Sequence, residues 1–154
     1  MIIHLATDHA GFEHKQAIAV WLESEGMTVV DHGAHEYDAL DDFPDFISLA
    51  AAAVSKKPQT ECAIIFGGSG TGEAIVANRF PNVRCAVLYA DSADIVALSR
   101  EHNNANVLSI GARFVSIDEA KKHVWSWLHT DTLLEEKYQR RNKKIEILTK
   151  ELQS

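Results

Sequence analysis

The sequence predicts an α/β protein in which helices cover both faces of a five-stranded parallel sheet. Three observations support this fold class. Short apolar segments alternate with helical segments along all 154 residues. The apolar segments lack a polar face, as is typical of strands buried on both sides. Polar residues follow several of these segments, where sheets of this class bind ligands at the carboxyl ends of their strands.

Each element is predicted from its periodicity and its boundaries. The expected strands are residues 2–7, 28–30, 62–66, 84–89 and 107–110. The expected helices are residues 12–25, 46–54, a segment running to about residue 79, 92–101, 117–128 and 134–152. The first helix is predicted to end at Gly26, and the segment HGAHEYDALDDFPD (32–45) is predicted to be a mostly polar loop.

Composition indicates a single globular domain over residues 1–154. The chain is 46% hydrophobic and 24% charged, and its net charge is −7 from 15 basic and 22 acidic residues. This acidity disfavours nucleic acids and anionic membranes as partners. With no apolar run of membrane-spanning length and no signal peptide expected, we predict a cytoplasmic protein. Cys62 and Cys85 lie in apolar runs, which favours buried free thiols over a disulfide.

The segment GGSGTGEAIVANR (67–79) follows the third expected strand and places Glu73 directly after four glycines. A dinucleotide fingerprint would need glycine at position 73, and a P-loop would end in Gly-Lys-Ser/Thr, so neither motif is present. We therefore predict a loop that encloses a ligand. Asp8 and His9 follow the first strand and Arg113 follows the last, so these residues are expected to meet the loop at one edge of the sheet.

The last helix combines basic and apolar residues. Five of the 15 basic residues fall within eight positions, namely Lys137, Arg140, Arg141, Lys143 and Lys144. They offer a local positive field for a small anion in an otherwise acidic protein. Apolar residues on the same helix, Tyr138, Ile145, Leu148 and Leu152, need cover from the domain or from a second subunit.

Five motifs together resemble the type B ribose-5-phosphate isomerases, a family that includes isomerases of allose and galactose 6-phosphates. They are TDHAGFEHK (7–15), DDFPDF (41–46), GGSGTGEAIVANR (67–79), REHNNANVLSIGAR (100–113) and RRNKKIEIL (140–148). They occur in the family's order and cover the chain from about Ile2 to Leu148. Five separate motifs make the resemblance far more specific than a glycine loop alone.

The resemblance implies a Rossmann-like three-layer α/β/α sandwich and an aldose–ketose isomerisation through an enediolate, without metal or cofactor. It also implies a homodimer, or a dimer of dimers, whose sites use both subunits. Glu73 would be the base, Ser69 would add a hydroxyl donor, and His102 would open the sugar ring. Residues implied to bind substrate are Asp8, His9, Gly68, Ser69, Gly70, Thr71, Gly72 and Asn103, with Arg113, Arg140 and Lys144 on the phosphate.

Three positions depart from the commonest family pattern. Gly67 stands where many members carry a catalytic cysteine; the chain instead resembles a branch with the form GGSG-x-GE, in which the glutamate is the base. Phe43 replaces a frequent tyrosine and lacks its hydroxyl. Lys144 matches a phosphate-binding arginine and keeps the charge, but it loses the bidentate geometry.

Simpler structural interpretations exist for most of these residues. Glu73 could be a first-turn acid favoured by the helix dipole, Ser69 a helix cap, and His102 a cation at a helix end. Arg140 and Lys144 could form a solvated face, and Asp8 and His9 could be ordinary loop residues. His32, His35 and Glu36 form no complete metal site, because a third clear ligand is missing.

Three other functions remain open, one of which is a metal-dependent isomerase. The same chemistry could act on a hexose 6-phosphate such as allose or galactose 6-phosphate. The fold could alternatively serve a non-catalytic phosphosugar-binding module.

Overall fold

The computed structural model describes all residues, 1–154, as one α/β unit. Its strands are β1 (Ile2–Thr7), β2 (Thr28–Asp31), β3 (Glu61–Gly67), β4 (Cys85–Leu88) and β5 (Val107–Gly111). Its helices are α1 (Phe12–Ser24), α2 (Phe43–Lys56), α3 (Thr71–Ala77), α4 (Ala93–Glu101), α5 (Ile117–Leu128) and α6 (Glu136–Gln153), with a short 3-10 turn, η1, at His9–Gly11. The predicted five-stranded parallel sheet is confirmed.

The strands pair in the order β2-β1-β3-β5-β4, and every pairing is parallel. Register brings the carboxyl ends of the three central strands together: Thr7 pairs with Phe66, and Gly67 pairs with Gly111. The segments that follow β1, β3 and β5 therefore begin side by side at one edge of the sheet.

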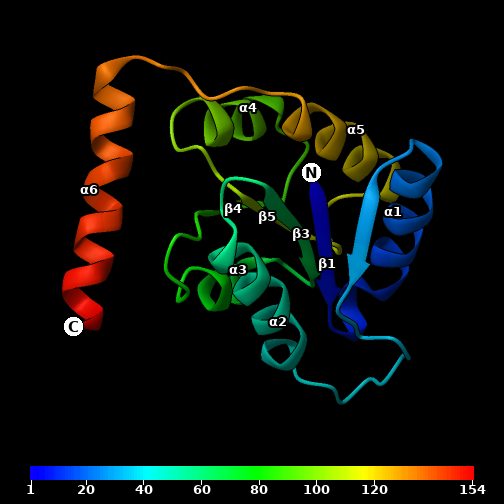
Figure 1. Ribbon diagram of the computed structural model, residues 1–154. Helices are drawn as coiled ribbons and strands as arrows, with labels where there is room; N and C mark the ends of the chain where they lie inside the picture. Colours follow the sequence, from blue (N-terminus) through cyan, green and yellow to red (C-terminus); the bar gives the residue numbers. More distant parts are fainter.

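Two apolar cores lie on opposite faces of the sheet, as in a three-layer sandwich (Figure 1). One core packs α1, α4 and α5 on the sheet and contains Trp127 and Leu22. The other core packs α2 and α3 on the opposite face and contains Ile47 and Ala77. Burial on both faces explains why the strands carry no polar face.

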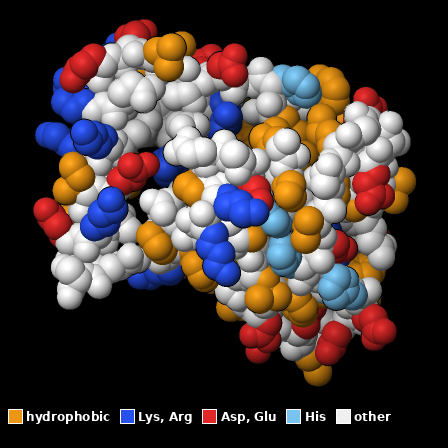
Figure 2. Space-filling view, viewed as in Figure 1, with side chains coloured by type: hydrophobic (Ala, Val, Ile, Leu, Met, Phe, Trp, Pro, Cys, Tyr) orange, Lys and Arg blue, Asp and Glu red, His pale blue; other side chains and the backbone are white.

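Helix α6 stands beside the sandwich like an arm, joined to it by the segment that follows α5 (Figure 1). Lys and Arg side chains gather along this arm, and a hollow separates it from the body (Figure 2). Much of its apolar surface is uncovered: Ile145 is 45% exposed, Leu148 54% and Leu152 78%. The chain itself therefore does not supply the cover that the apolar residues of α6 need.

The predicted boundaries need small corrections. Helix α2 begins at Phe43, not at residue 46, because Pro44 is well tolerated in the first turn of a helix. The polar loop is correspondingly shorter, and α6 runs from Glu136 to Gln153. None of the helices is long and apolar enough to cross a membrane. Both cysteines are free; Cys62 is buried, as predicted, whereas Cys85 on the edge strand is partly exposed.

Candidate active site

The carboxyl edge of the sheet brings together the polar residues that the sequence predicts there. Asp8 follows β1, the glycine loop follows β3, and Arg113 follows β5. The backbone N–H groups of Ala112 and Arg113 donate to the carbonyl oxygens of Gly67 and Gly68 at 2.8 and 3.1 Å. These bonds join the loop after β3 to the loop after β5, so the expected convergence is confirmed.

The glycine loop is shaped by close packing and by one left-handed residue. Gly70 has a φ of +77°, which glycine adopts without strain, and its carbonyl oxygen accepts a 2.7 Å hydrogen bond from Ser109 Oγ. Ser69 Oγ lies 2.6 Å from Thr71 Oγ1 and accepts a 3.3 Å hydrogen bond from the Thr71 N–H. The loop therefore leads into α3 with its serine and threonine hydroxyls paired.

Glu73 lies in the first turn of α3, and its carboxylate fills the space above Gly67. A β-carbon at position 67 would fall 2.0 Å from Cδ of Glu73, so no other residue fits there without displacing the carboxylate. Glu73 is only 4% exposed. Burial raises its pKa, and the nearby negative charge of Asp8 adds to the rise. Burial therefore outweighs the hydrogen bond from the backbone N–H of Glu73 in the first turn of the helix, which favours the charged form.

Asp8 and His9 form a polar cluster beside Glu73 with Asp41, a residue from the loop before α2. Asp8 is buried, and its Oδ1 accepts a 2.9 Å hydrogen bond from the Ala10 N–H. His9 Nδ1 lies 2.7 Å from Asp41 Oδ1. One ligand atom from each member of the trio lies within 4.8 Å of the others. Because the histidine and Asp41 already hydrogen-bond each other, we assign them no metal.

Two further side chains press on the glycine loop. The guanidinium of Arg113 lies over Gly68, where a β-carbon would approach its Cζ to 3.1 Å. The ring of Phe43 lies over Gly72, where a β-carbon would approach it to 2.9 Å. A side chain at either position would have to displace the guanidinium or the ring. Phe43 packs where the family's usual tyrosine would stand.

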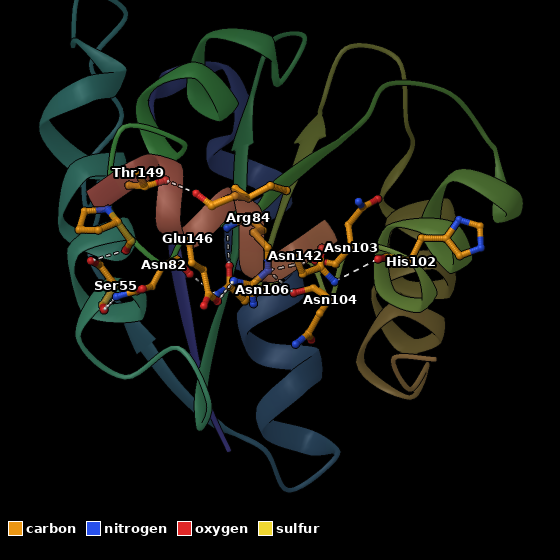
Figure 3. A network of polar contacts seen from close by, with 12 residues as sticks. Ser55, Asn82, Arg84, His102, Asn103, Asn104, Asn106, Asn142, Glu146 and Thr149 are labelled. Atoms are coloured by element: carbon orange, nitrogen blue, oxygen red, sulfur yellow. Dashed lines mark hydrogen bonds and ion pairs between the residues drawn. The ribbon is translucent and has the colours of Figure 1, made fainter. Parts of the chain in front are cut away.

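His102 lies elsewhere, at the end of α4. Its ring stacks on Tyr138 of α6, with centroids 4.3 Å apart and planes 10° from parallel. Its carbonyl oxygen accepts a 3.1 Å hydrogen bond from Asn142 Nδ2. In Figure 3 the His102 ring points away from a polar network that holds this corner of the molecule. Asn103 follows and is exposed.

Arg84 organises the network in Figure 3. Its Nε donates to the carbonyl oxygens of Asn103 and Asn104, both at 3.0 Å, and its Nη1 lies 3.4 Å from Glu146 of α6. The Arg84 side chain is only 9% exposed. The connection from α4 to β5 is thereby fixed to α6, and the backbone that carries His102 is held firmly.

Arg140 and Lys144 both project from the exposed surface of α6. They lie one turn apart, as predicted. Arg140 forms an ion pair with Glu136 in the same helix. An anion that binds Arg140 must compete with this carboxylate.

The predicted site residues therefore occupy two separate edges of one chain. Glu73 lies at the carboxyl edge, whereas His102 precedes β5 and so lies at the amino edge. A strand of five residues at about 3.3 Å per residue separates the two edges by roughly 17 Å. A general base and a ring-opening group must both reach the same end of a sugar, within hydrogen-bond distance. One chain alone cannot place both there.

Neither thiol offers a reactive thiolate. Burial raises the pKa of Cys62 to about 12. Cys85 is partly exposed as a residue, but desolvation of its thiol, with the nearby charge of Glu73, also raises its pKa well above its usual value. The thiols therefore supply no base, whereas Glu73 is a buried carboxylate directly above the loop.

Comparison with known proteins now places these features in a family. The sequence model of a family described as Ribose/Galactose Isomerase matches residues 3–145. The chain belongs to this family. A ribose-5-phosphate isomerase B from Mycolicibacterium paratuberculosis is 42% identical over 141 residues, which cover 92% of this chain and 87% of the relative. The Escherichia coli ribose-5-phosphate isomerase B is 35% identical, over 82% of each chain.

Solved structures of the family resemble the whole chain. Ribose-5-phosphate isomerase B from Mycoplasma genitalium, with bound ribulose-5-phosphate, superposes with a TM-score of 0.92 at 36% identity and covers 97% of both chains. The enzyme from Clostridium thermocellum superposes with a TM-score of 0.90 at 34% identity and covers 99% of both chains. The Rossmann-like fold expected from the resemblance is thereby confirmed.

The sequence assigned no role to Asp41, Arg84 or Asn142, and it predicted for Tyr138 only an apolar contact of the last helix, not the stacking on His102. Asp41 stands in the DDFPDF motif, but its partner His9 is 32 residues away, and no local pattern pairs them. Arg84 stands alone before β4, with nothing in the sequence to tie it to the α4–β5 connection. These contacts come from the tertiary structure.

Proposed function

We propose that the protein interconverts ribose 5-phosphate and ribulose 5-phosphate through an enediolate. One observation carries this proposal: a buried carboxylate of raised pKa, Glu73, lies against the glycine loop in a member of the ribose/galactose isomerase family. A carboxylate whose pKa is raised toward neutrality is suited to general base catalysis. The glycine loop brings backbone groups close enough to stabilise a developing oxyanion.

In the proposed reaction, Glu73 takes the proton from C2 of the open-chain aldose. The electron pair forms the C1–C2 double bond, and the carbonyl oxygen at C1 becomes the enediolate oxygen. The carboxylic acid then returns the proton to C1, while the hydroxyl proton of O2 moves to O1. Ser69 and the loop from Gly68 to Gly72, with Thr71, hold the enediolate oxygens, and Asp8 binds the sugar hydroxyls.

The remaining roles belong to the other edge of the chain and to Arg113. His102 moves a proton between the ring oxygen and the anomeric hydroxyl when the cyclic sugar opens, which suits a histidine near neutral pH. Asn103 binds a sugar oxygen. Arg113, Arg140 and Lys144 bind the phosphate, which places it at the far end of the substrate from Glu73.

Because Glu73 and His102 lie on opposite edges of the sheet, we propose a homodimer. In it, the corner of one copy that carries His102 and α6 completes the active site of the other copy. Exposed apolar residues continue from α6 to the surface around the edge strand β4: Ile75 is 60% exposed, Tyr89 59% and Ile95 48%. A second copy that covers this surface would remove it from water, which favours association.

The activity is tested with ribose 5-phosphate in deuterium oxide, in the presence of excess chelator. We expect ribulose 5-phosphate to form with deuterium at C1, because the carboxylic acid exchanges with solvent before it returns the proton. Allose and galactose 6-phosphates serve as parallel substrates. Faster turnover of a hexose phosphate would change the assigned substrate, and deuterium-free sugar with no turnover would support a binding module.

The proposed assembly predicts that two inactive chains restore each other. Glu73→Gln and His102→Asn chains are co-expressed with different tags and assayed on ribose 5-phosphate. Random pairing makes half of the dimers mixed, and each mixed dimer has one intact site. Activity should therefore return to about a quarter of the wild-type value.

A matched pair gives the control. Glu73→Gln and Asp8→Asn alter the same edge of the sheet, so every site of their mixed dimer carries one of the two changes. This pair should stay inactive. Failure of the first pair to regain activity in purified mixed dimers, or an active monomer in sedimentation, would contradict the shared site.

A further inference from the structure

His9 is held by two hydrogen bonds to one carboxylate oxygen of Asp41. Asp41 Oδ1 accepts the backbone N–H of His9 at 3.0 Å and lies 2.7 Å from its ring nitrogen Nδ1. A carboxylate oxygen can only accept, so Nδ1 must carry the proton. This fixes the ring and leaves Nε2, which makes no hydrogen bond within the chain, available to an external group.

The charges around His9 favour its protonated form. The Asp41 side chain is only 10% exposed, and its Oδ2 has no hydrogen-bond partner, so His9 is its one compensating charge. Asp8 Oδ2 lies 3.9 Å from the same Nδ1, while Arg113 opposes the proton. The ring of Tyr37 lies edge-on at 6.3 Å. The hydrogen bond that His9 donates to Asp41, aided by the charge of Asp8, raises the pKa of His9.

We propose that Asp41 is a positioning residue for the isomerisation: it keeps His9 as an imidazolium whose Nε2–H is presented to an anionic oxygen of the substrate. This inference rests on the proposed function. His9 follows β1 at the same edge as Glu73 and Arg113, and its side chain is 26% exposed, so a bound phosphosugar can reach it. A charge-assisted donor binds an anionic oxygen more strongly than a neutral imidazole does.

The decisive variant is Asp41→Asn, because the amide oxygen can still accept both bonds while the negative charge is lost. His9 should then titrate at lower pH, which is measured from its ring protons by NMR. At a pH between the two measured titration midpoints of His9, kcat/KM for ribose 5-phosphate should fall by up to about tenfold, the difference between a charged and a neutral hydrogen bond. Lowering the pH should shrink this loss of kcat/KM, because His9 then binds its proton without Asp41.

Two further measurements identify the oxygen that His9 contacts. Weaker inhibition by inorganic phosphate in Asp41→Asn assigns the contact to the phosphate group. Unchanged phosphate inhibition with a lower kcat assigns it to an oxygen that becomes charged during the reaction. Either result supports an imidazolium donor held by Asp41.

Asp45→Asn is the matched control, since it makes the same change at an exposed residue in the first turn of α2. It should leave the His9 titration and the KM as they are. A His9 titration unchanged in Asp41→Asn, or a mutant-to-wild-type ratio of kcat/KM that is the same at every pH, would overturn the inference. An inactive wild-type protein would instead reject the proposed function, and the NMR titration would still report on the Asp41–His9 pair.

Discussion

Replacing Glu73 by glutamine should lower turnover by about 10²–10⁴-fold while substrate binding is largely kept, because the amide retains the shape of the carboxylate but cannot accept a proton from carbon. The side chain is buried above Gly67, so a glutamine of the same shape keeps its packing there. Steady-state kinetics on ribose 5-phosphate provide kcat and KM. Single-turnover measurements show whether the loss lies in the chemical step.

The raised pKa of Glu73 leads to two further predictions for the Glu73→Gln variant. In the wild type, kcat/KM should rise with pH through the pKa of Glu73, because only the carboxylate acts as a base; this dependence should vanish in Glu73→Gln. Folding a buried carboxylate favours its protonated form, so wild-type stability falls as the pH rises through that pKa. Glu73→Gln should therefore melt at a higher temperature than the wild type at pH 8, and the gain should shrink at pH 4.

Glu13→Gln offers the matched control, since Glu13 also lies in the first turn of a helix and is exposed. It should change neither turnover nor the pH dependence. Near-normal turnover in a folded Glu73→Gln protein would remove Glu73 from the reaction and return it to a stabilising role at the helix N-terminus.

The sheet was predictable from sequence because each strand is short, apolar on both faces and followed by a helix. The convergence of Asp8, the glycine loop and Arg113 was predictable for a related reason: parallel strands end at a common edge. The burial of Glu73 was not predictable, because a local sequence pattern locates the start of a helix but does not show which residues pack over it. The structure settles which of the two opposing effects on its pKa prevails.

The division of the candidate site between two edges could have been found from topology. His102 lies after a helix and before a strand, a position that belongs to the amino edge of a parallel sheet. The sequence motif EHNNAN indicates chemistry but does not indicate at which edge of the sheet it lies. The hydrogen bond between His9 and Asp41 could not be predicted from the sequence, since no local pattern joins residues 32 positions apart.

Gly67 should prove as sensitive as Glu73, although it carries no reactive group. In Gly67→Ala the new methyl group would overlap the carboxylate of Glu73, since a β-carbon there lies 2.0 Å from Cδ. The carboxylate is the free end of a flexible side chain and can move aside at little cost in stability. Turnover should nevertheless fall by about 10²-fold or more, because a base displaced by an ångström or so loses its alignment with the reacting carbon.

The double variant Gly67→Ala/Glu73→Gln decides whether the two residues act as one unit. If the alanine acts only by moving the carboxylate, the double variant should be no slower than Glu73→Gln alone, a strong departure from additivity. Gly68→Ala is the matched contrast: its methyl group would meet the Arg113 guanidinium, with Cζ at 3.1 Å, so its loss should fall mainly on KM and on phosphate inhibition. Normal turnover in Gly67→Ala, or losses that add in the double variant, would show that Glu73 does not work from the position above Gly67. The expected result would explain why a glycine stands at position 67 in a chain whose base is a glutamate: the catalytic carboxylate occupies the space that any side chain there would need.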